Sequence, residues 1–145
     1  MFKHLLVPVD SSSSSGQAVR KALGLAQACG SAVTAIYVVD PYAFSGVGAD
    51  FSYGQAEYLD AATLEAEEAL KATREIFEGQ GLTIATSLVE GHAVYRGILE
   101  TAATVGADLI VMGSHGRRGL DKLLLGSVTS QVLSHTHLPV LVVRD

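Results

Sequence analysis

The chain has 145 residues, of which 48% are hydrophobic, with 15 glycines and a formal net charge of −5. This composition predicts one packed domain over residues 1–145, and the acidic balance argues against a nucleic-acid partner, which would need a basic face. No apolar run approaches the roughly 20 residues of a membrane span. The single cysteine, Cys29, excludes a disulfide within the chain and favours a cytoplasmic location.

Short apolar runs rich in β-branched residues alternate with helical patterns along the chain. The runs are continuously apolar, which is typical of strands buried on both faces. In chain order the predicted strands are Lys3–Val9, Ala32–Val39, Thr83–Val89, Asp108–Met112 and Pro139–Val143. The predicted helices are Ser14–Cys29, Gln55–Glu78, Ala93–Val105 and a fourth that follows Gly126 and ends before Leu138. This alternation predicts an α/β fold with a doubly wound, Rossmann-like parallel sheet and helices on both faces.

One segment, Asp40–Gly54, is longer than the usual connection in such a fold. Its Gly46-Val47-Gly48 resembles the start of a dinucleotide fingerprint, but Phe51 stands where the third glycine is required. We therefore expect a flexible flap here rather than a phosphate loop.

A glycine-rich segment follows the fourth predicted strand. In an open parallel sheet, ligands bind beyond the carboxyl ends of the strands, near the point where the strand order reverses. The segment reads Gly113-Ser114-His115-Gly116-Arg117-Arg118-Gly119, and Gly126-Ser127 then opens the fourth helix. Small residues let a backbone approach phosphates closely, and the N–H groups at a helix start attract anions. Together with the positive charge of Arg117, this pattern predicts a triphosphate site between Gly113 and Ser127.

Several other motifs accompany this loop. They are Val7-Pro8-Val9-Asp10, Val38-Val39-Asp40, Glu90-Gly91-His92, the run from Gly106 to Gly116, and Gly126-Ser127-Val128-Thr129. With these motifs the chain resembles, over nearly its whole length, the ATP-binding branch of the universal stress protein family. The resemblance implies the strand order 3-2-1-4-5, ATP with Mg²⁺ as the ligand, a stress-response regulatory role and a homodimer paired through Pro139–Val143. One departure is Ser11, where many family members have glycine.

The resemblance, together with the positive charge of Arg117 in the loop, gives a set of candidate binding residues. They are Pro8, Asp10, Val38, Met112, Gly113, Gly116, Arg117, Gly126, Ser127 and Val128. Pro8 and Asp10 would line the adenosine pocket, with Asp10 near the ribose or a nucleotide-bound metal, and Val38 would meet the adenine through its backbone. The glycines and Ser127 would hold the phosphates. An alternative for Asp10 is a purely structural role as a helix N-cap, and His115 either contacts a phosphate or holds the loop by hydrogen bonds.

Two other functions stay open at this stage. A slow ATPase or a phosphoryl or nucleotidyl transferase would need paired carboxylates for Mg²⁺ and a lysine or base at the γ-phosphate. The Walker pattern is absent and Asp10 is the only carboxylate expected at the centre, so the sequence favours a binding protein over an enzyme. In a flavodoxin-like electron carrier, Ser11–Ser15 would cradle the FMN phosphate, but the best glycine loop follows the fourth strand and not the first.

Overall fold

The computed structural model describes residues 1–41, 50–115 and 125–145, and for residues 50–53 and 55 only the backbone. The strands are β1 (His4–Pro8), β2 (Ala32–Val39), β3 (Ala85–Glu90), β4 (Leu109–Gly113) and β5 (Val140–Val143). The helices are α1 (Ser13–Cys29), α2 (Asp50–Glu78), α3 (Val94–Val105) and α4 (Ser127–His135).

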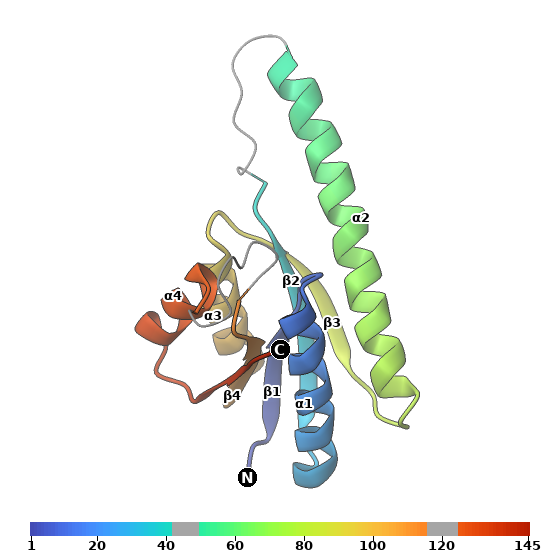
Figure 1. Ribbon diagram of the computed structural model, residues 1–145, viewed down its shortest axis with the longest axis vertical. Coiled ribbons are helices and arrows are strands. Elements are labelled where there is room, and N and C mark those ends of the chain that lie inside the picture. Colours follow the sequence, from blue (N-terminus) through green and yellow to red (C-terminus); the bar gives the residue numbers. More distant parts are fainter. Residues whose placement is uncertain (42–49, 116–124) are drawn as a thin grey trace.

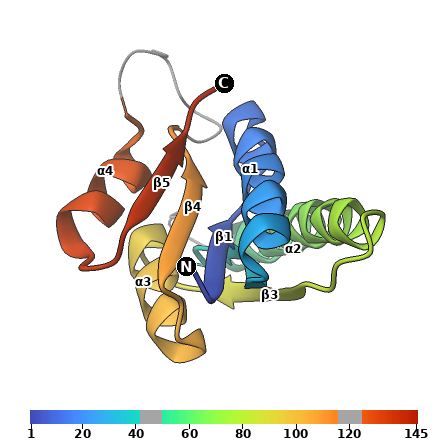
Figure 2. The same cartoon turned by 90° about the horizontal axis from the view of Figure 1, so that it is seen from below.

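The strands form one parallel sheet in the order β3-β2-β1-β4-β5, which confirms the predicted fold (Figures 1 and 2). β1 lies at the centre, and the direction in which the chain adds strands reverses there, because β2 and β4 flank it. Helices α1 and α2 cover one face of the sheet, and α3 and α4 cover the other (Figure 2). The carboxyl ends of β1 and β4 are therefore neighbours at the point where the order reverses.

The side chains of the central strands alternate between two apolar clusters. Leu5 and Val7 of β1 pack with α1 and α2, whereas Leu6 packs with α3 and α4, and all three are fully buried. A central strand covered on both faces needs apolar residues at every position. This explains why the strands read as continuous apolar runs.

The structure moves the predicted start of two elements by more than one residue. β3 begins at Ala85 and not at Thr83, and its residues alternate between exposed and half-buried because it is an edge strand. α2 begins at Asp50, so residues 50–54, predicted to belong to a flap, are helical. The flap residues 42–49 lie outside the described part of the chain.

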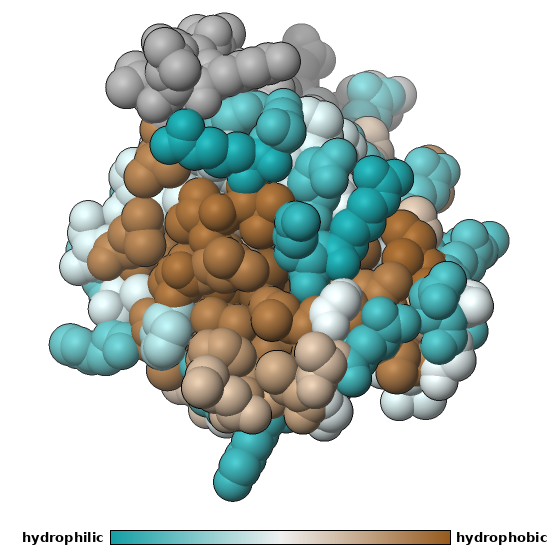
Figure 3. Space-filling view, turned by 60° about the horizontal axis from the view of Figure 1, so that its bottom comes forward, coloured by the Kyte–Doolittle hydropathy of each residue, from teal (hydrophilic) through white to brown (hydrophobic). Residues whose placement is uncertain are grey.

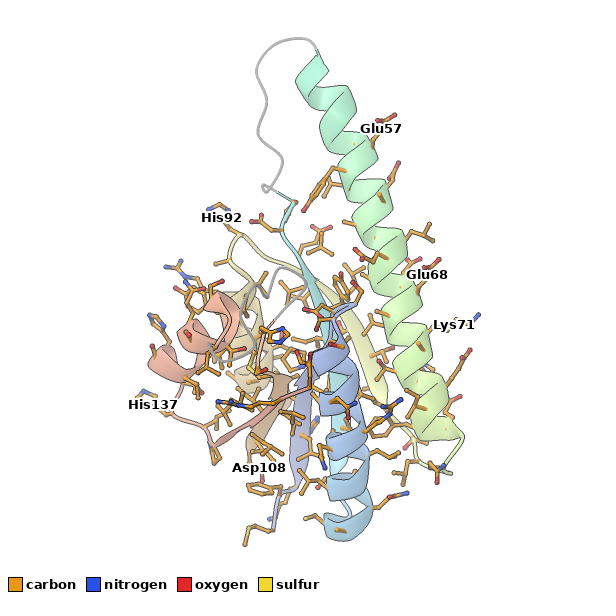
Figure 4. The ribbon with its side chains drawn as sticks, in the orientation of Figure 1. Glu57, Glu68, Lys71, His92, Asp108 and His137 are labelled. Carbon is orange, nitrogen blue, oxygen red and sulfur yellow. The ribbon has the colours of Figure 1, made fainter. Side chains whose placement is uncertain are left out.

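α2 is an amphipathic helix. Its charged residues Glu57, Glu68 and Lys71 point away from the sheet (Figure 4), whereas Leu70 and Phe77 are buried against it. Within the described residues, no helix has both the length and the apolar character that a bilayer crossing requires.

Candidate functional site

A cavity of about 700 Å³ lies at the carboxyl edge of the sheet. Its floor comes from the ends of β1, β2 and β4, and its walls come from all four helices. The lining residues are Pro8, Val9, Asp10, Ser12, Ser15, Tyr37, Val38, Val39, Asp40, Tyr58, Ala61, Ala62, Glu65, Val94, Ile98, Met112, Gly113, His115, Gly126, Ser127, Val128 and Thr129. Its volume and mixed apolar and polar lining suit a small organic ligand.

The structure brings together every predicted binding residue that it describes. Pro8, Asp10, Val38, Met112, Gly113, Gly126, Ser127 and Val128 all line the cavity. The two others, Gly116 and Arg117, lie outside the described residues. Pro8 at the end of β1 and Gly113 at the end of β4 are far apart in the sequence, and they meet because β4 pairs with β1.

Asp10 forms a tight turn between β1 and α1. Its Oδ1 accepts a hydrogen bond from the backbone N–H of Ser12 at 2.7 Å, and its own N–H donates to Ser15 Oγ at 3.0 Å. The N-cap of α1 is Ser12, whose Oγ accepts from the N–H of Ser15 at 3.2 Å. The alternative of Asp10 as the helix N-cap is therefore wrong, although the carboxylate does brace the turn. Its Oδ2 accepts no hydrogen bond from the described residues, and the side chain is half-buried beside the cavity.

A close approach of α3 to β2 shapes a second wall. A Cβ atom on Gly97 would lie only 3.0 Å from Val38 Cγ1, so glycine allows the helix to pack directly onto this strand. The same approach brings Val94 and Ile98 of α3 to the cavity beside Val38. These apolar side chains form an apolar slot at this end of the cavity, which suits a flat ring.

The end of β4 and the start of α4 form the opposite wall. A Cβ on Gly113 would lie 2.9 Å from the carbonyl carbon of Ser14, which leaves no room for a side chain there. Gly126 is the N-cap of α4, and among the described residues no side chain hydrogen-bonds to this helix start. The N–H groups of the first turn of a helix lack partners within the helix and favour an anion. This wall can therefore accept a negatively charged group.

His115 lies at the same wall, with its side chain 10% exposed. Its Nε2 is 3.8 Å from Asp145 Oδ2, and the same carboxylate oxygen accepts a hydrogen bond from Ser13 Oγ at 2.8 Å. The imidazole thus both lines the cavity and contacts the segment after β5. The geometry is compatible with either role considered for this residue, a phosphate contact or support of the loop.

The structure adds two functional candidates that the sequence did not single out, Tyr58 and Glu65, and it places at the cavity Asp40, which the sequence indicated only as part of a motif. Tyr58 and Glu65 of α2 and Asp40 after β2 line the cavity, so Asp10 is not its only carboxylate, contrary to the expectation. Glu65 is held in place because its Oε1 accepts a hydrogen bond from Ser11 Oγ at 3.0 Å. The helical pattern of α2 was visible in the sequence, but nothing in it indicated that this helix passes over the edge of the sheet.

Two other titratable groups lie at opposite ends of the sheet (Figure 4). His92, beyond the end of β3, has its Nδ1 3.8 Å from Oδ1 of the cavity residue Asp40. Asp108 lies at the far end of the sheet from His92. Backbone N–H donors from Lys3 and then His4 lower the pKa of Asp108. In the last turn of α4, His135 Nδ1 contacts the carbonyl of Gln131 at 2.8 Å. Within the described residues, no group of three or more His, Cys, Asp or Glu side chains is arranged to hold a metal ion.

Comparisons with known proteins agree with this architecture. The model of the universal stress protein family matches residues 1–144. A universal stress protein of Methanocaldococcus jannaschii is 39% identical over 144 residues, which span 99% of this chain and 83% of that protein. The solved structure of the universal stress protein UspA from Lactobacillus plantarum superposes with a TM-score of 0.86 at 29% identity, over 98% of this chain and 97% of the other. A solved universal stress protein in complex with cAMP has a TM-score of 0.71 at 27% identity, over 99% and 97% of the two chains. The chain therefore belongs to the universal stress protein family.

Proposed function

We propose that this protein binds ATP, with its Mg²⁺, in the cavity at the carboxyl edge of the sheet and acts in the cytoplasm as a regulatory module in a stress response. The observation that carries the proposal is that one cavity joins an apolar slot at Val38 to an anion-accepting helix start at Gly126. An adenine nucleotide has this division, because a flat apolar base is linked through a ribose to charged phosphates. A related family member has been solved with an adenine nucleotide, cAMP.

The roles of the individual residues follow from their places in the cavity. The adenine would occupy the slot beside Val38 and Ile98, and the phosphates would face Gly113 and the start of α4. Asp10 suits the ribose hydroxyls or a nucleotide-bound Mg²⁺, since Oδ1 is engaged with Ser12 and Oδ2 is not. The metal would neutralise phosphate charge and is carried by the nucleotide.

Calorimetric titration with ATP, ADP and AMP tests the proposal, and we expect micromolar affinity for ATP. Gly126→Val should abolish binding, because a side chain at the helix start blocks the approach of phosphate. Gly126 has φ −66° and ψ 162°, which valine adopts readily, so the far-UV circular dichroism should not change. Leu125→Ala is the matched control, because this neighbouring side chain is exposed and does not line the cavity. Absence of heat with all three nucleotides would refute the proposal.

Slow hydrolysis is a second candidate activity. The carboxylates of Asp40 and Glu65 line the cavity together with Asp10, and phosphoryl-transfer sites use carboxylates to hold Mg²⁺. Among the described lining residues there is no lysine to contact a γ-phosphate. We therefore favour binding over turnover. Release of inorganic phosphate over hours, measured in the same samples and lost in Asp10→Ala, would instead favour the enzyme.

We further propose a homodimer paired through β5. This strand is an edge of the sheet, and an unpaired apolar edge invites association. Leu141 of β5 is 38% exposed and Leu133 of α4 is 41% exposed, and Figure 3 shows an apolar area on the side of the molecule where β5 lies. A two-fold axis beside β5 would cover this strand in both copies at once.

A further inference from the structure

The cavity extends over both faces of the sheet, because the side chains of β2 alternate between the faces up to the end of this strand. Val38 belongs to the apolar cluster under α3 and α4, whereas Tyr37 and Val39 belong to the cluster under α1 and α2. All three residues line the cavity. The apolar slot at Val38 therefore takes up only one side of the cavity, and a second part lies on the side of α2.

Helix α2 supplies the outer wall of this second part. The helix extends beyond the carboxyl end of β2 (Figure 1), and four of its residues line the cavity: Tyr58, Ala61, Ala62 and Glu65. Their spacing of three, four and seven residues places them on one face of the helix. Together with Tyr37 and Val39 they form what we call the α2 lobe. Tyr58 is 36% exposed although it lies on this face, so the described residues leave the lobe open to a ligand.

Glu65 gives the α2 lobe a negative charge at a fixed place. Its Oε1 accepts the hydrogen bond from Ser11 Oγ, which holds the carboxylate in position without neutralising its charge. The described residues that line the cavity include no lysine or arginine, and His115 lies at the opposite wall with α4. The α2 lobe therefore favours a cation, whereas the start of α4 favours an anion.

The other lining groups determine what kind of cation fits. Tyr37 and Tyr58 offer aromatic rings, which pack against apolar groups and attract cations over their faces. Val39 is apolar, and the small side chains of Ala61 and Ala62 leave room beside the rings. An ammonium group on an apolar body complements both the rings and the carboxylate.

We propose that the α2 lobe binds a small organic amine, whose ammonium group donates to Glu65 and whose apolar body packs against Tyr37 and Tyr58. The site goes beyond the proposed nucleotide function and does not depend on it, because the slot for the base and the wall for the phosphates lie on the side of α3 and α4.

The test compares phenethylamine with phenethyl alcohol in NMR titrations of the full chain without nucleotide. The two probes share one aromatic body and differ in charge. The wild type should bind the amine about tenfold more tightly, which corresponds to one charge-assisted hydrogen bond. Glu65→Gln should remove this preference and change the affinity for the alcohol by less than about twofold. Glu68→Gln is the matched control, because Glu68 points away from the sheet (Figure 4), and it should keep the preference.

A second variant tests the place of binding. Ala61→Leu should fill the lobe and prevent both probes from binding, and leucine is well tolerated in a helix. Its control is Ala56→Leu, at an exposed position of α2 that does not line the cavity, and this variant should keep both affinities.

Three results would each overturn the proposal: no preference for the amine in the wild type, an unchanged preference in Glu65→Gln, or retained binding in Ala61→Leu. A titration of the same samples with ATP reports on the proposed function separately. Absence of ATP binding beside an intact preference for the amine would overturn the nucleotide function and leave the amine site in place.

Discussion

The contact between Gly113 and Ser14 gives a sharp prediction about stability. In Gly113→Ala, the new methyl group would lie 2.9 Å from the carbonyl carbon of Ser14 and 3.0 Å from its Cβ. The carbonyl carbon belongs to the backbone of Ser14 and the Cβ is bonded to that backbone, so a rotamer change of this fully buried residue cannot relieve the overlap. Overpacking of this kind costs about 1–3 kcal/mol, and we expect the free energy of unfolding to fall by this amount. Urea denaturation followed by circular dichroism measures it.

The same substitution at Gly24 is the control and should have the opposite sign. Gly24 lies inside α1, and a Cβ built on it meets no atom within 4 Å. Alanine is preferred over glycine in a helix interior, so Gly24→Ala should stabilise the protein by about 0.5–1 kcal/mol. If Gly113→Ala also stabilises the protein, or leaves the urea midpoint unchanged, then α1 and β4 are not packed as closely as the structure has them.

Three further predictions concern the cavity, the edge strand and the amino end of the sheet. Asp10→Ala should weaken ATP–Mg²⁺ binding about tenfold. Asp10→Asn should keep the melting temperature, because its amide oxygen can still accept from Ser12, but it should bind ATP–Mg²⁺ more weakly in calorimetry. Wild-type affinity in the Asn variant would mean that Asp10 has a structural role only. Leu141→Lys, in the edge strand β5, should shift the sedimentation coefficient toward that of a monomer. The control Leu64→Lys, at an exposed leucine of α2, should not shift it. A wild type that is monomeric at tens of micromolar would exclude the dimer. Because the pKa of Asp108 is lowered in the folded state, its contribution to stability is present above the unfolded pKa and is lost as the pH falls through the folded value. Between about pH 4 and pH 2, the urea midpoint should therefore fall less steeply with decreasing pH in Asp108→Asn than in the wild type. Equal slopes for the two proteins would show that Asp108 does not contribute to the loss of stability in acid.

The order of the elements could be predicted from the sequence because the central strands are apolar at every position. The prediction was weaker for the edge strand β3, whose residues are exposed or only half-buried, and this strand begins two residues later than predicted, at Ala85. The predicted start of α2 was late because Gly46, Gly48 and Gly54 suggested a loop, whereas the helix already begins at Asp50.

The candidate site was predictable where residues follow directly from a strand end. Pro8, Val38 and Gly113 stand at such ends, and parallel strands bring their carboxyl ends to one edge. The choice of Ser12 over Asp10 as the helix N-cap could not be made, because both residue types cap well and the decision depends on where the chain turns. The hydrogen bonds from Ser14 to the His115 carbonyl and from Thr129 to the Gly113 carbonyl could not be predicted either, because they join elements far apart in the chain.

The place of the cavity where the strand order reverses has a consequence for folding. The first half of the chain supplies β1, α1, β2 and α2 to it, and the second half supplies α3, β4 and α4, so neither half encloses it alone. A ligand held there would bind only when both parts have docked, and it would stabilise the whole domain by mass action. At 100 times its dissociation constant, such a ligand adds about 2.7 kcal/mol to the free energy of unfolding. The free energy of unfolding of the whole domain would then rise with the concentration of free ligand in the surroundings.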